Sequence, residues 1–305
     1  MAARRKETAI VAVTSDGDLS PDIASVATAV GSRREAAWII EHVDEVLGLR
    51  GHARDETVRS LAARRRAGEP LQYVLGRWSF RTIELEVDQR VLIPRPETEQ
   101  VVEVALARLN AARKGRGAAE AAACCDLGTG SGAIALSLAV EAPAPVGGLE
   151  IWATDRSPDA LAVATANRDR LSLAGRLGST RVELAEGDWF GALPASLVGR
   201  LDLIVANPPY VTASEYEELD PTIRCFEPRT ALVSGPGRSG TPGMSDIEGI
   251  LGAAPRWLRP GGFAVVEIAP HQADATVAAA RAAGFASADI ERDLAGRPRM
   301  VVAAC

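Results

Sequence analysis

Hydrophobic residues recur at helical spacing through the first quarter of the chain. The stretch SRREAAWIIEHVDEVLGL places apolar residues every three or four positions, which is the period of an amphipathic helix. It follows SPDIASVATAV, where Ser20 can cap a helix and Pro21 can begin it. A third amphipathic stretch, RDETVRSLAARRRAG, ends at Gly68. Together these stretches predict a small helical domain over residues 20–70.

The pattern then changes to alternation between apolar and polar residues. In LQYVLGRWSFRTIELEVDQRVLIP this period of two is typical of strands, so residues 71–94 are predicted to form a β-hairpin that links two domains. Pro96 and Glu97 open a helical pattern in RPETEQVVEVALARL, at the start of a second domain over residues 95–305. Residues 1–19 show no periodicity and are predicted to be a disordered tail.

Beyond residue 120, short apolar runs alternate with helical stretches. The apolar runs cover residues 121–127, 149–154, 181–185, 201–206 and 261–268, and the helical stretches cover 132–140, 157–171 and 246–258. The tail ADIERDLAGRPRMVVAAC predicts two further strands around a Gly-Arg-Pro turn. Alternation of this kind indicates an α/β fold in which helices cover both faces of a doubly wound, mostly parallel, seven-stranded sheet.

Composition and charge narrow the classes of function. The chain is 47% hydrophobic and 24% charged, as in soluble globular proteins, and no stretch approaches the roughly 18–20 apolar residues of a membrane span. The N-terminus lacks the apolar centre of a signal peptide, so we expect a cytoplasmic protein. A net charge of −6 argues against a dedicated nucleic-acid binder. No cysteine pair or histidine spacing suits zinc.

A glycine-rich turn follows the first of the later apolar runs, in CDLGTGSGAIALSLA. Gly128, Gly130 and Gly132 let the backbone take positive φ angles and approach a ligand closely, and the N–H groups at the start of the helix favour a negative group. Asp126, just before the glycines, could meet a ligand's ammonium group directly or through water. The spacing also fits a loose dinucleotide fingerprint, so an NAD-dependent enzyme remains open at this point.

Acidic residues at the next two strand ends favour S-adenosylmethionine. Asp155 in ATD can accept hydrogen bonds from both ribose hydroxyls, whereas capping of the following helix belongs more naturally to Ser157. In EGDWF, Asp188 can accept from the adenine amino group and Trp189 can cover the ring face, although Trp189 could also be a core residue. These residues share the carboxyl edge of the predicted sheet, where such folds bind ligands.

The fourth strand ends in Asn207, Pro208, Pro209 and Tyr210, where two prolines remove two backbone donors. An amide nitrogen is a poor nucleophile because its lone pair is delocalised. The Asn207 side-chain oxygen and the Pro208 carbonyl can accept its two N–H groups and direct its electron density toward a sulfonium methyl group, while Tyr210 lies against the flat substrate group. The methylated nitrogen is transiently acidic, so no general base is required. A protein glutamine and an exocyclic amine of a nucleic-acid base both fit this corner.

The motifs together resemble the HemK/PrmC family, which methylates peptide-chain release factors. The resemblance spans about residues 33–305 and is carried, in order, by REAAWIIEHVDEVLGL, RRRAGEPLQYVLGRWSF, VLIPRPETEQVVE, DLGTGSGAIALSLA, DWF, NPPYV, EPRTAL and DLAGRPRMV. Two places depart from the family pattern. Residues 234–250 stand where a shorter Gly-Gly-x-Asp-Gly-Leu motif is usual, and Ala269 stands where glycine is usual.

The resemblance implies a class I S-adenosylmethionine-dependent methyltransferase with a Rossmann-like fold. Its substrate would be the N5 nitrogen of the glutamine in the Gly-Gly-Gln motif of release factors, and its effect a modulation of translation termination. The implied cofactor site is Gly128–Gly132, with Thr129 and Ser131, together with Asp155, Trp189 and Asn207, and the implied substrate site is Asn207–Tyr210. The helical domain would help hold the release factor, without direct contact to nucleic acid or membrane.

Three other functions fit the sequence less well than the function that this resemblance implies. A base methylase needs a basic surface and a recognition module, which the charge of −6 and the small helical domain do not favour. A module that only binds a translation factor would not need an intact Asn207–Tyr210 motif, and an NAD-dependent enzyme gives that motif no role.

Overall fold

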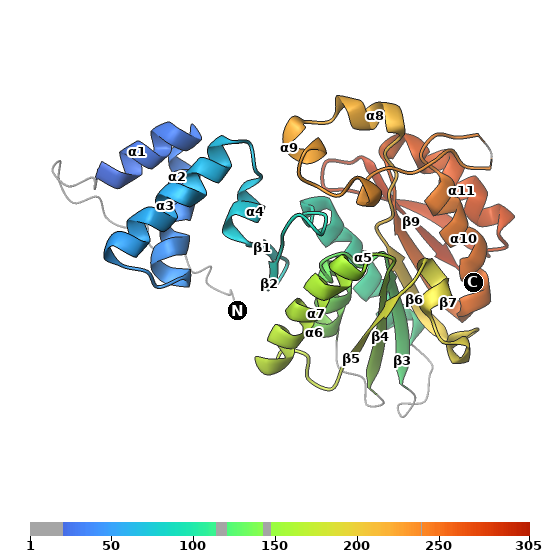
Figure 1. The fold of residues 1–305 in the computed structure, drawn as a ribbon. Helices are drawn as coiled ribbons and strands as arrows, with labels where there is room; N and C mark the ends of the chain where they lie inside the picture. The colour runs from blue at the N-terminus through green and yellow to red at the C-terminus, as the bar shows by residue number, and fades with distance from the viewer. Residues whose placement is uncertain (1–20, 114–120, 143–147, 239) are drawn as a thin grey trace, which may run out of the picture. The chain divides into compact units, whose positions relative to one another are not determined.

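The computed structural model describes residues 21–113, 121–142, 148–238 and 240–305 (Figure 1). The chain divides into two compact units, one that ends at Leu75 and one from Gly76 to Cys305. The predicted tail over residues 1–19 and the proposed cap Ser20 lie outside the described residues. Among the helices that are described, none combines the length and the apolar character needed to cross a membrane.

The first unit is helical. Its elements are α1 (Pro21–Val30), α2 (Arg33–Glu41), the π-helical turn η1 (His42–Val46), α3 (Gly51–Arg66) and α4 (Leu71–Leu75). Ser32 caps α2 by accepting a hydrogen bond of 3.2 Å from the Glu35 N–H. The apolar stripes seen in the sequence meet in one core, which contains Ala36, Ile39, Ile40, Val43, Val58, Leu61, Leu71 and Val74.

The start of the predicted hairpin is wrong, because residues 71–75 form helix α4 and not a strand. The turn begins at Pro70, whose carbonyl accepts from the N–H groups of Tyr73 and Val74 at 3.0 Å each. The carbonyl of Tyr73, near the end of this short helix, accepts from the Arg64 guanidinium at 2.9 Å. Five mostly apolar residues fit a buried helical turn as well as a strand.

The hairpin itself is shorter and belongs to the second unit. Its strands are β1 (Arg77–Phe80) and β2 (Ile83–Glu86). At the turn, Arg81 takes a φ of +50° and forms a 2.7 Å ion pair with Glu141. The Asn167 carboxamide accepts from the Glu86 N–H at 2.7 Å and donates to the carbonyls of Glu86 and Ser131 at 3.0 Å each. Asn167 therefore ties the hairpin to the glycine turn.

A seven-stranded sheet forms the centre of the second unit, with strand order β5-β4-β3-β6-β7-β9-β8. The strands are β3 (Ala122–Leu127), β4 (Leu149–Asp155), β5 (Arg181–Glu186), β6 (Leu201–Ala206), β7 (Leu258–Glu267), β8 (Ser287–Arg292) and β9 (Pro298–Ala304). The first five are parallel, and β9 runs antiparallel to both β7 and β8. The predicted fold class is confirmed, including the two strands of the tail.

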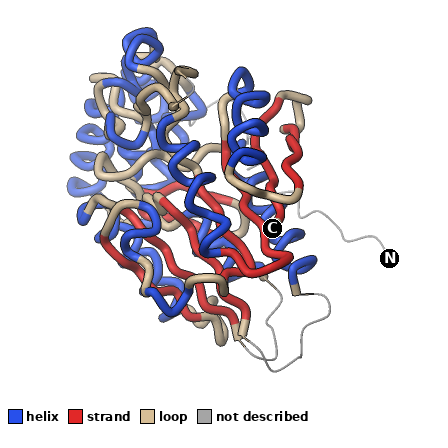
Figure 2. Tube along the Cα trace, turned by 90° about the vertical axis from the view of Figure 1, so that its right-hand side faces the viewer, coloured by secondary structure: helices blue, strands red, loops and turns tan. Residues whose placement is uncertain are grey.

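Helices cover both faces of this sheet (Figure 1, Figure 2). The longer ones are α5 (Pro96–Ala112), α6 (Ala133–Glu141), α7 (Pro158–Leu173), α10 (Ser245–Trp257) and α11 (Ala273–Ala282). The short elements are α8 (Ala213–Glu218), α9 (Pro221–Arg224), η2 (Trp189–Ala192), η3 (Ala195–Leu197), η4 (Arg229–Ala231) and η5 (Pro270–Gln272). Ile204 packs in the core that α10 and α11 share, while its neighbours Leu203 and Val205 are buried too. A strand buried on both faces has a nearly continuous apolar sequence, as in LDLIVA, where Asp202 is the one charged residue and is paired with Arg259.

Candidate active site

A pocket lies at the carboxyl ends of β3, β4, β5 and β6, where the strand order changes direction from β3 toward β4 on one side and β6 on the other. Open α/β sheets bind ligands at such a point. Seven of the predicted site residues line the pocket, namely Gly128, Gly130, Asp155, Asp188, Trp189, Asn207 and Pro209. The others lie behind its wall.

The glycine turn needs glycine for space as well as for conformation. Gly128 has a φ of +75° and Gly132 a φ of +85°, a region that costs other L-residues strain. A Cβ on Gly132 would lie 2.8 Å from the Leu136 side chain, and one on Gly128 would lie 3.1 Å from the Trp189 ring. The N–H of Gly128 donates to the Thr154 carbonyl at 2.8 Å, which fixes the turn to the end of β4.

Asp126 lies under the turn, fully buried, and is not part of the pocket lining. Its Oδ2 accepts from the Thr129 hydroxyl at 2.6 Å and from the Ala135 N–H at 3.1 Å, so it holds the turn against the start of α6. Burial raises the pKa of Asp126 to about 7; the bonds from Thr129 and Ala135 lower it, and the charge of Asp155 raises it. Its Oδ1 is buried and has no partner among the described residues.

Asp155 lies at the pocket wall and connects the glycine turn to the start of α7. Its Oδ2 accepts from the Gly130 N–H and its Oδ1 from the Ser157 N–H, each at 2.9 Å. Ser157 caps α7 by accepting from the Ala160 N–H at 3.2 Å, which confirms the predicted cap. A carboxylate has about four acceptor positions, so Asp155 retains capacity for two hydroxyl donors.

Asp188 and Trp189 follow β5, the strand beside β4, and also line the pocket. Asp188 is exposed, and Trp189 is half-buried with a φ of +46°, which is unusual for a large residue. The Thr154 hydroxyl donates to the Trp189 carbonyl at 3.2 Å and supports this conformation. The ring packs against the core below α10 and also lines the pocket, so both interpretations of Trp189 from the sequence describe part of its position.

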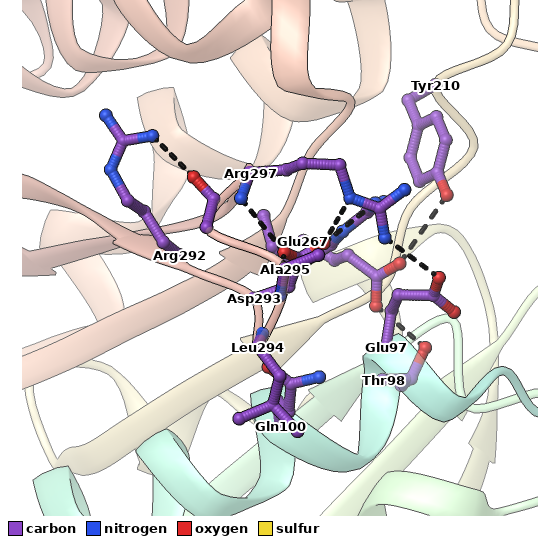
Figure 3. Close-up of polar contacts among 12 residues, drawn as sticks. Glu97, Thr98, Gln100, Tyr210, Glu267, Arg292, Asp293, Leu294, Ala295 and Arg297 are labelled. Atoms are coloured by element: carbon purple, nitrogen blue, oxygen red, sulfur yellow. Dashed lines mark hydrogen bonds and ion pairs between the residues drawn. The ribbon is translucent and has the colours of Figure 1, made fainter.

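Asn207 is connected to two residues that the sequence did not indicate. Its Nδ2 donates to the Thr98 hydroxyl at 3.1 Å, and that hydroxyl donates to Glu267 Oε2 at 2.7 Å. The Tyr210 hydroxyl lies 3.5 Å from Glu267 Oε1, a long contact (Figure 3). Burial raises the pKa of the Tyr210 phenol, and the nearby Glu267 carboxylate raises it further. Tyr210 therefore points its hydroxyl at Glu267 behind the corner.

The other predicted site residues either line the pocket or lie buried beside it. Asn207 and Pro209 line the pocket, whereas Pro208 is buried and Tyr210 is not part of the lining. Thr129 and Ser131 are also buried, and they support the turn through their contacts with Asp126 and Asn167. The structure thus separates the pocket wall from the side chains that hold it in place.

A further part of the pocket lining comes from motifs for which no chemical role was predicted. This part includes Val91 and Leu92 of VLIPRPETEQ, Arg90 just before that motif, and Pro228, Thr230 and Ala231 of EPRTAL. Glu227, 4% exposed, joins these segments by a 2.6 Å ion pair with Arg95 and by accepting from the Ile93 N–H at 3.3 Å. The signal that could have found Glu267 is a lone carboxylate that ends the apolar run FAVVE.

The two departures from the family pattern are accommodated locally. Gln272 donates to the carbonyls of Tyr210 and Pro242 at 3.2 Å each, so the longer 234–250 loop is attached to the Asn207–Tyr210 corner. Ala269 has a φ of −73°, which any residue adopts, and its N–H donates to Gln272 Oε1 at 3.0 Å. No glycine is needed at that position.

Comparison with known proteins gives a consistent result. The family model for a methyltransferase small domain matches residues 107–223. A release factor glutamine methyltransferase of Bordetella pertussis is 41% identical over 88% of this chain and 88% of its own length. One from Pseudomonas aeruginosa is 41% identical, with coverage of 79% and 77%, and one from Xylella fastidiosa is 38% identical, with coverage of 89% and 88%.

Solved structures align less closely. A ribosomal protein L11 methylase of Lactobacillus delbrueckii subsp. bulgaricus has a TM-score of 0.43 and 18% identity, with coverage of 70% of this chain and 81% of that one. The sequence identity with the curated relatives extends over most of both chains. The chain therefore belongs to the release factor glutamine methyltransferase family.

Proposed function

We propose that this chain transfers a methyl group from S-adenosylmethionine to the N5 side-chain nitrogen of the glutamine in the Gly-Gly-Gln motif of peptide-chain release factors, and so modulates translation termination. Membership of the family supports this reaction. The observation that carries it is the Asn207 side chain, whose NH2 group is engaged by Thr98 at 3.1 Å on the wall of a pocket shared with Asp155.

The pocket residues suit the cofactor in charge and in hydrogen-bonding capacity. Asp155 accepts the ribose hydroxyls, Asp188 accepts from the adenine amino group, and Trp189 covers the adenine ring. The unpaired, buried Oδ1 of Asp126 is an acceptor that an ammonium group, or a water bound to one, would complete. The turn Gly128–Gly132, with Thr129 and Ser131, holds the amino-acid end, and Asn207 borders it. When bound, S-adenosylmethionine supplies a sulfonium methyl group that is open to attack by nitrogen.

The Asn207 corner prepares the substrate amide. The Asn207 oxygen accepts one N–H of the glutamine and the Pro208 carbonyl accepts the other, which holds the nitrogen in line and reduces delocalisation of its lone pair. Pro209 limits the space beside the amide, and Tyr210 stiffens the corner through its contacts with Glu267 and Gln272. Glu267 accepts from Thr98 and so acts behind Asn207, and the product's proton passes to water without a dedicated base.

The protein substrate and the cellular location complete the proposal. In this proposal the helical unit helps hold the release factor, the reaction takes place in the cytoplasm, and neither nucleic acid nor membrane is a direct partner. Two arginines of the basic run at the end of α3 are already paired: Arg64 with Glu69 at 2.6 Å and Arg65 with Glu35 at 2.7 Å. This pairing offsets two of the positive charges that a phosphate backbone would need there.

Transfer of a radiolabelled methyl group tests this proposal. The full chain is incubated with labelled S-adenosylmethionine and, in parallel, with release factor, with a release factor whose Gly-Gly-Gln glutamine is replaced by alanine, with DNA and with RNA. We expect label only on the unchanged release factor. Label on DNA or RNA would favour the base-methylating alternative, and calorimetric binding of NAD in place of S-adenosylmethionine would exclude methyl transfer.

A further inference from the structure

Three polar side chains from distant parts of the sequence meet behind the Asn207 corner. Thr98 lies in the first turn of α5, Glu267 is the last residue of β7, and Asn207 directly follows β6. The parallel register pairs Ala206 with Val266, so Asn207 and Glu267 leave neighbouring strands side by side. Thr98 is 4% exposed and Glu267 is 1% exposed, so water does not compete for their hydrogen bonds.

The direction of these hydrogen bonds follows from the atoms involved. An ionised carboxylate only accepts, so the Thr98 hydroxyl must donate its single proton to Glu267 Oε2, at 2.7 Å. Its oxygen then offers Asn207 only lone pairs, and the Asn207 atom that lies 3.1 Å away must be a donor. That atom is Nδ2. The carboxamide oxygen is therefore directed to the opposite side, away from Thr98.

We infer that Thr98 and Glu267 are positioning residues that fix the Asn207 carboxamide with its oxygen, and not its NH2 group, toward the acceptor nitrogen. The consequence for catalysis rests on the proposed function, while the orientation itself is a property of this chain. If the Asn207 carboxamide were turned by 180°, its NH2 group would face an N–H of the substrate, and two donors repel. The neutral, planar amide of the substrate could then not be held in line.

The fixed orientation of the Asn207 carboxamide depends on the charge of Glu267. Burial raises the pKa of Glu267 to about 7. The groups that face this carboxyl are the Thr98 hydroxyl, the Arg299 guanidinium and the Tyr210 hydroxyl, which lower its pKa, and the Glu97 carboxylate, which raises it. A protonated Glu267 can donate to Thr98, which frees the Thr98 proton to point at Asn207. The preference for one carboxamide orientation is then lost.

The side-chain amide signal of Asn207 in the ¹⁵N-labelled full chain tests the orientation without any substrate. The signal is assigned by its absence in Asn207→Asp. We expect one amide proton to exchange slowly with water and its shift to titrate with a midpoint near the pKa of Glu267, about 7. Thr98→Val removes the slow exchange, Thr98→Ser retains it, and Glu267→Gln, which keeps the volume, abolishes the titration.

A matched control is Thr165→Val, which removes a hydroxyl that donates to the Leu161 carbonyl at 2.7 Å on α7. It should leave the Asn207 signal unchanged. The inference is overturned if the slow exchange survives in Thr98→Val, or if the titration persists in Glu267→Gln. Should Thr98→Val fail to fold by circular dichroism, the Glu267→Gln titration decides alone.

Kinetics separate this inference from the proposed function. With release factor as substrate, Thr98→Val should lower kcat by roughly 10- to 100-fold, less than the loss of a direct contact, with the calorimetric Kd for S-adenosylmethionine within about twofold. Thr98→Ser should restore most of the rate. If the unchanged chain does not methylate release factor, the proposed function fails while the amide signal still reports the orientation. If Thr98→Val is fully active, the positioning role fails.

Discussion

The two halves of the pocket are built in different ways. The glycine-turn half takes its shape from backbone N–H groups within a few residues of one another, braced by Asp126 and Asp155, each at the end of a strand. The Asn207 half depends on side chains from α5 and β7, where Thr98 and Glu267 are 169 residues apart in sequence. The first half is built from turns at neighbouring strand ends, whereas the second also requires side chains from α5 and β7 before its chemistry is oriented.

The largest effect that this comparison predicts is at Asn207. Asn207→Ala removes the acceptor for the substrate amide, so we expect the rate of methyl transfer to fall by at least ~10², as when a direct transition-state contact is lost. The Kd for S-adenosylmethionine, measured by calorimetry, should change far less because the glycine turn is intact. Asn110→Ala, at an exposed position of α5, is the control. Retained activity in Asn207→Ala would contradict the mechanism.

In the other half, Asp155→Ala should act on affinity. Loss of the ribose acceptor should raise the Kd for S-adenosylmethionine by roughly 10- to 100-fold, in line with hydrogen bonds to a charged group of about 1.5–3 kcal/mol. The rate at saturating cofactor should stay within about threefold. Asp159→Ala removes an exposed carboxylate from the first turn of α7 and should do neither. A changed rate with unchanged affinity would mean that the ribose assignment is wrong.

The space inside the glycine turn gives a third, smaller effect. Gly132→Ala adds a Cβ at 2.8 Å from the Leu136 side chain at a φ of +85°, whereas Gly175→Ala meets no atom within 4 Å at a φ of +68°. Both substitutions carry the cost of a left-handed conformation, about 1–2 kcal/mol. Urea denaturation should show a further loss of about 1 kcal/mol in Gly132→Ala, from overpacking. Equal losses in the two variants would show that Leu136 moves aside freely.

The sequence indicated the first half well because its signals are local. The glycines, the strand ends at Asp155 and Asp188, and the Ser157 cap are each indicated by a few neighbouring residues, at the ends of β3, β4 and β5. It missed Thr98, Glu267 and Glu227, because contacts across more than a hundred residues leave no periodicity to detect. The helix at residues 71–75 was missed for another reason: the pattern is too short to distinguish a helical turn from a strand.

The smallest expected effect is a pH dependence that differs between the two halves of the pocket. Asp126 and Glu267 are both buried carboxyls whose pKa burial raises to about 7, but one supports the turn and the other supports Asn207. As pH falls from 8 to 6, both gain protons. Protonated Asp126 is a poorer acceptor for an ammonium group, so the affinity for S-adenosylmethionine should weaken. Protonated Glu267 releases the Asn207 carboxamide, so kcat at saturating substrates should fall.

The affinity for S-adenosylmethionine and kcat should each fall by about two- to fivefold. Protonation of Asp126 or Glu267 weakens the hydrogen bonds of that carboxyl but does not remove its side chain. Asp126→Asn should flatten the pH profile of the Kd and leave the profile of kcat in place, and Glu267→Gln should do the reverse. The direction of the two pKa shifts also determines how stability changes with pH. Both folded-state pKa values exceed the ordinary value near 4, so the folded chain binds more protons between about pH 4 and 7, and these two groups make the free energy of unfolding decrease as pH rises through that range. If one substitution flattens both profiles, the two halves are coupled through the sheet and do not titrate independently.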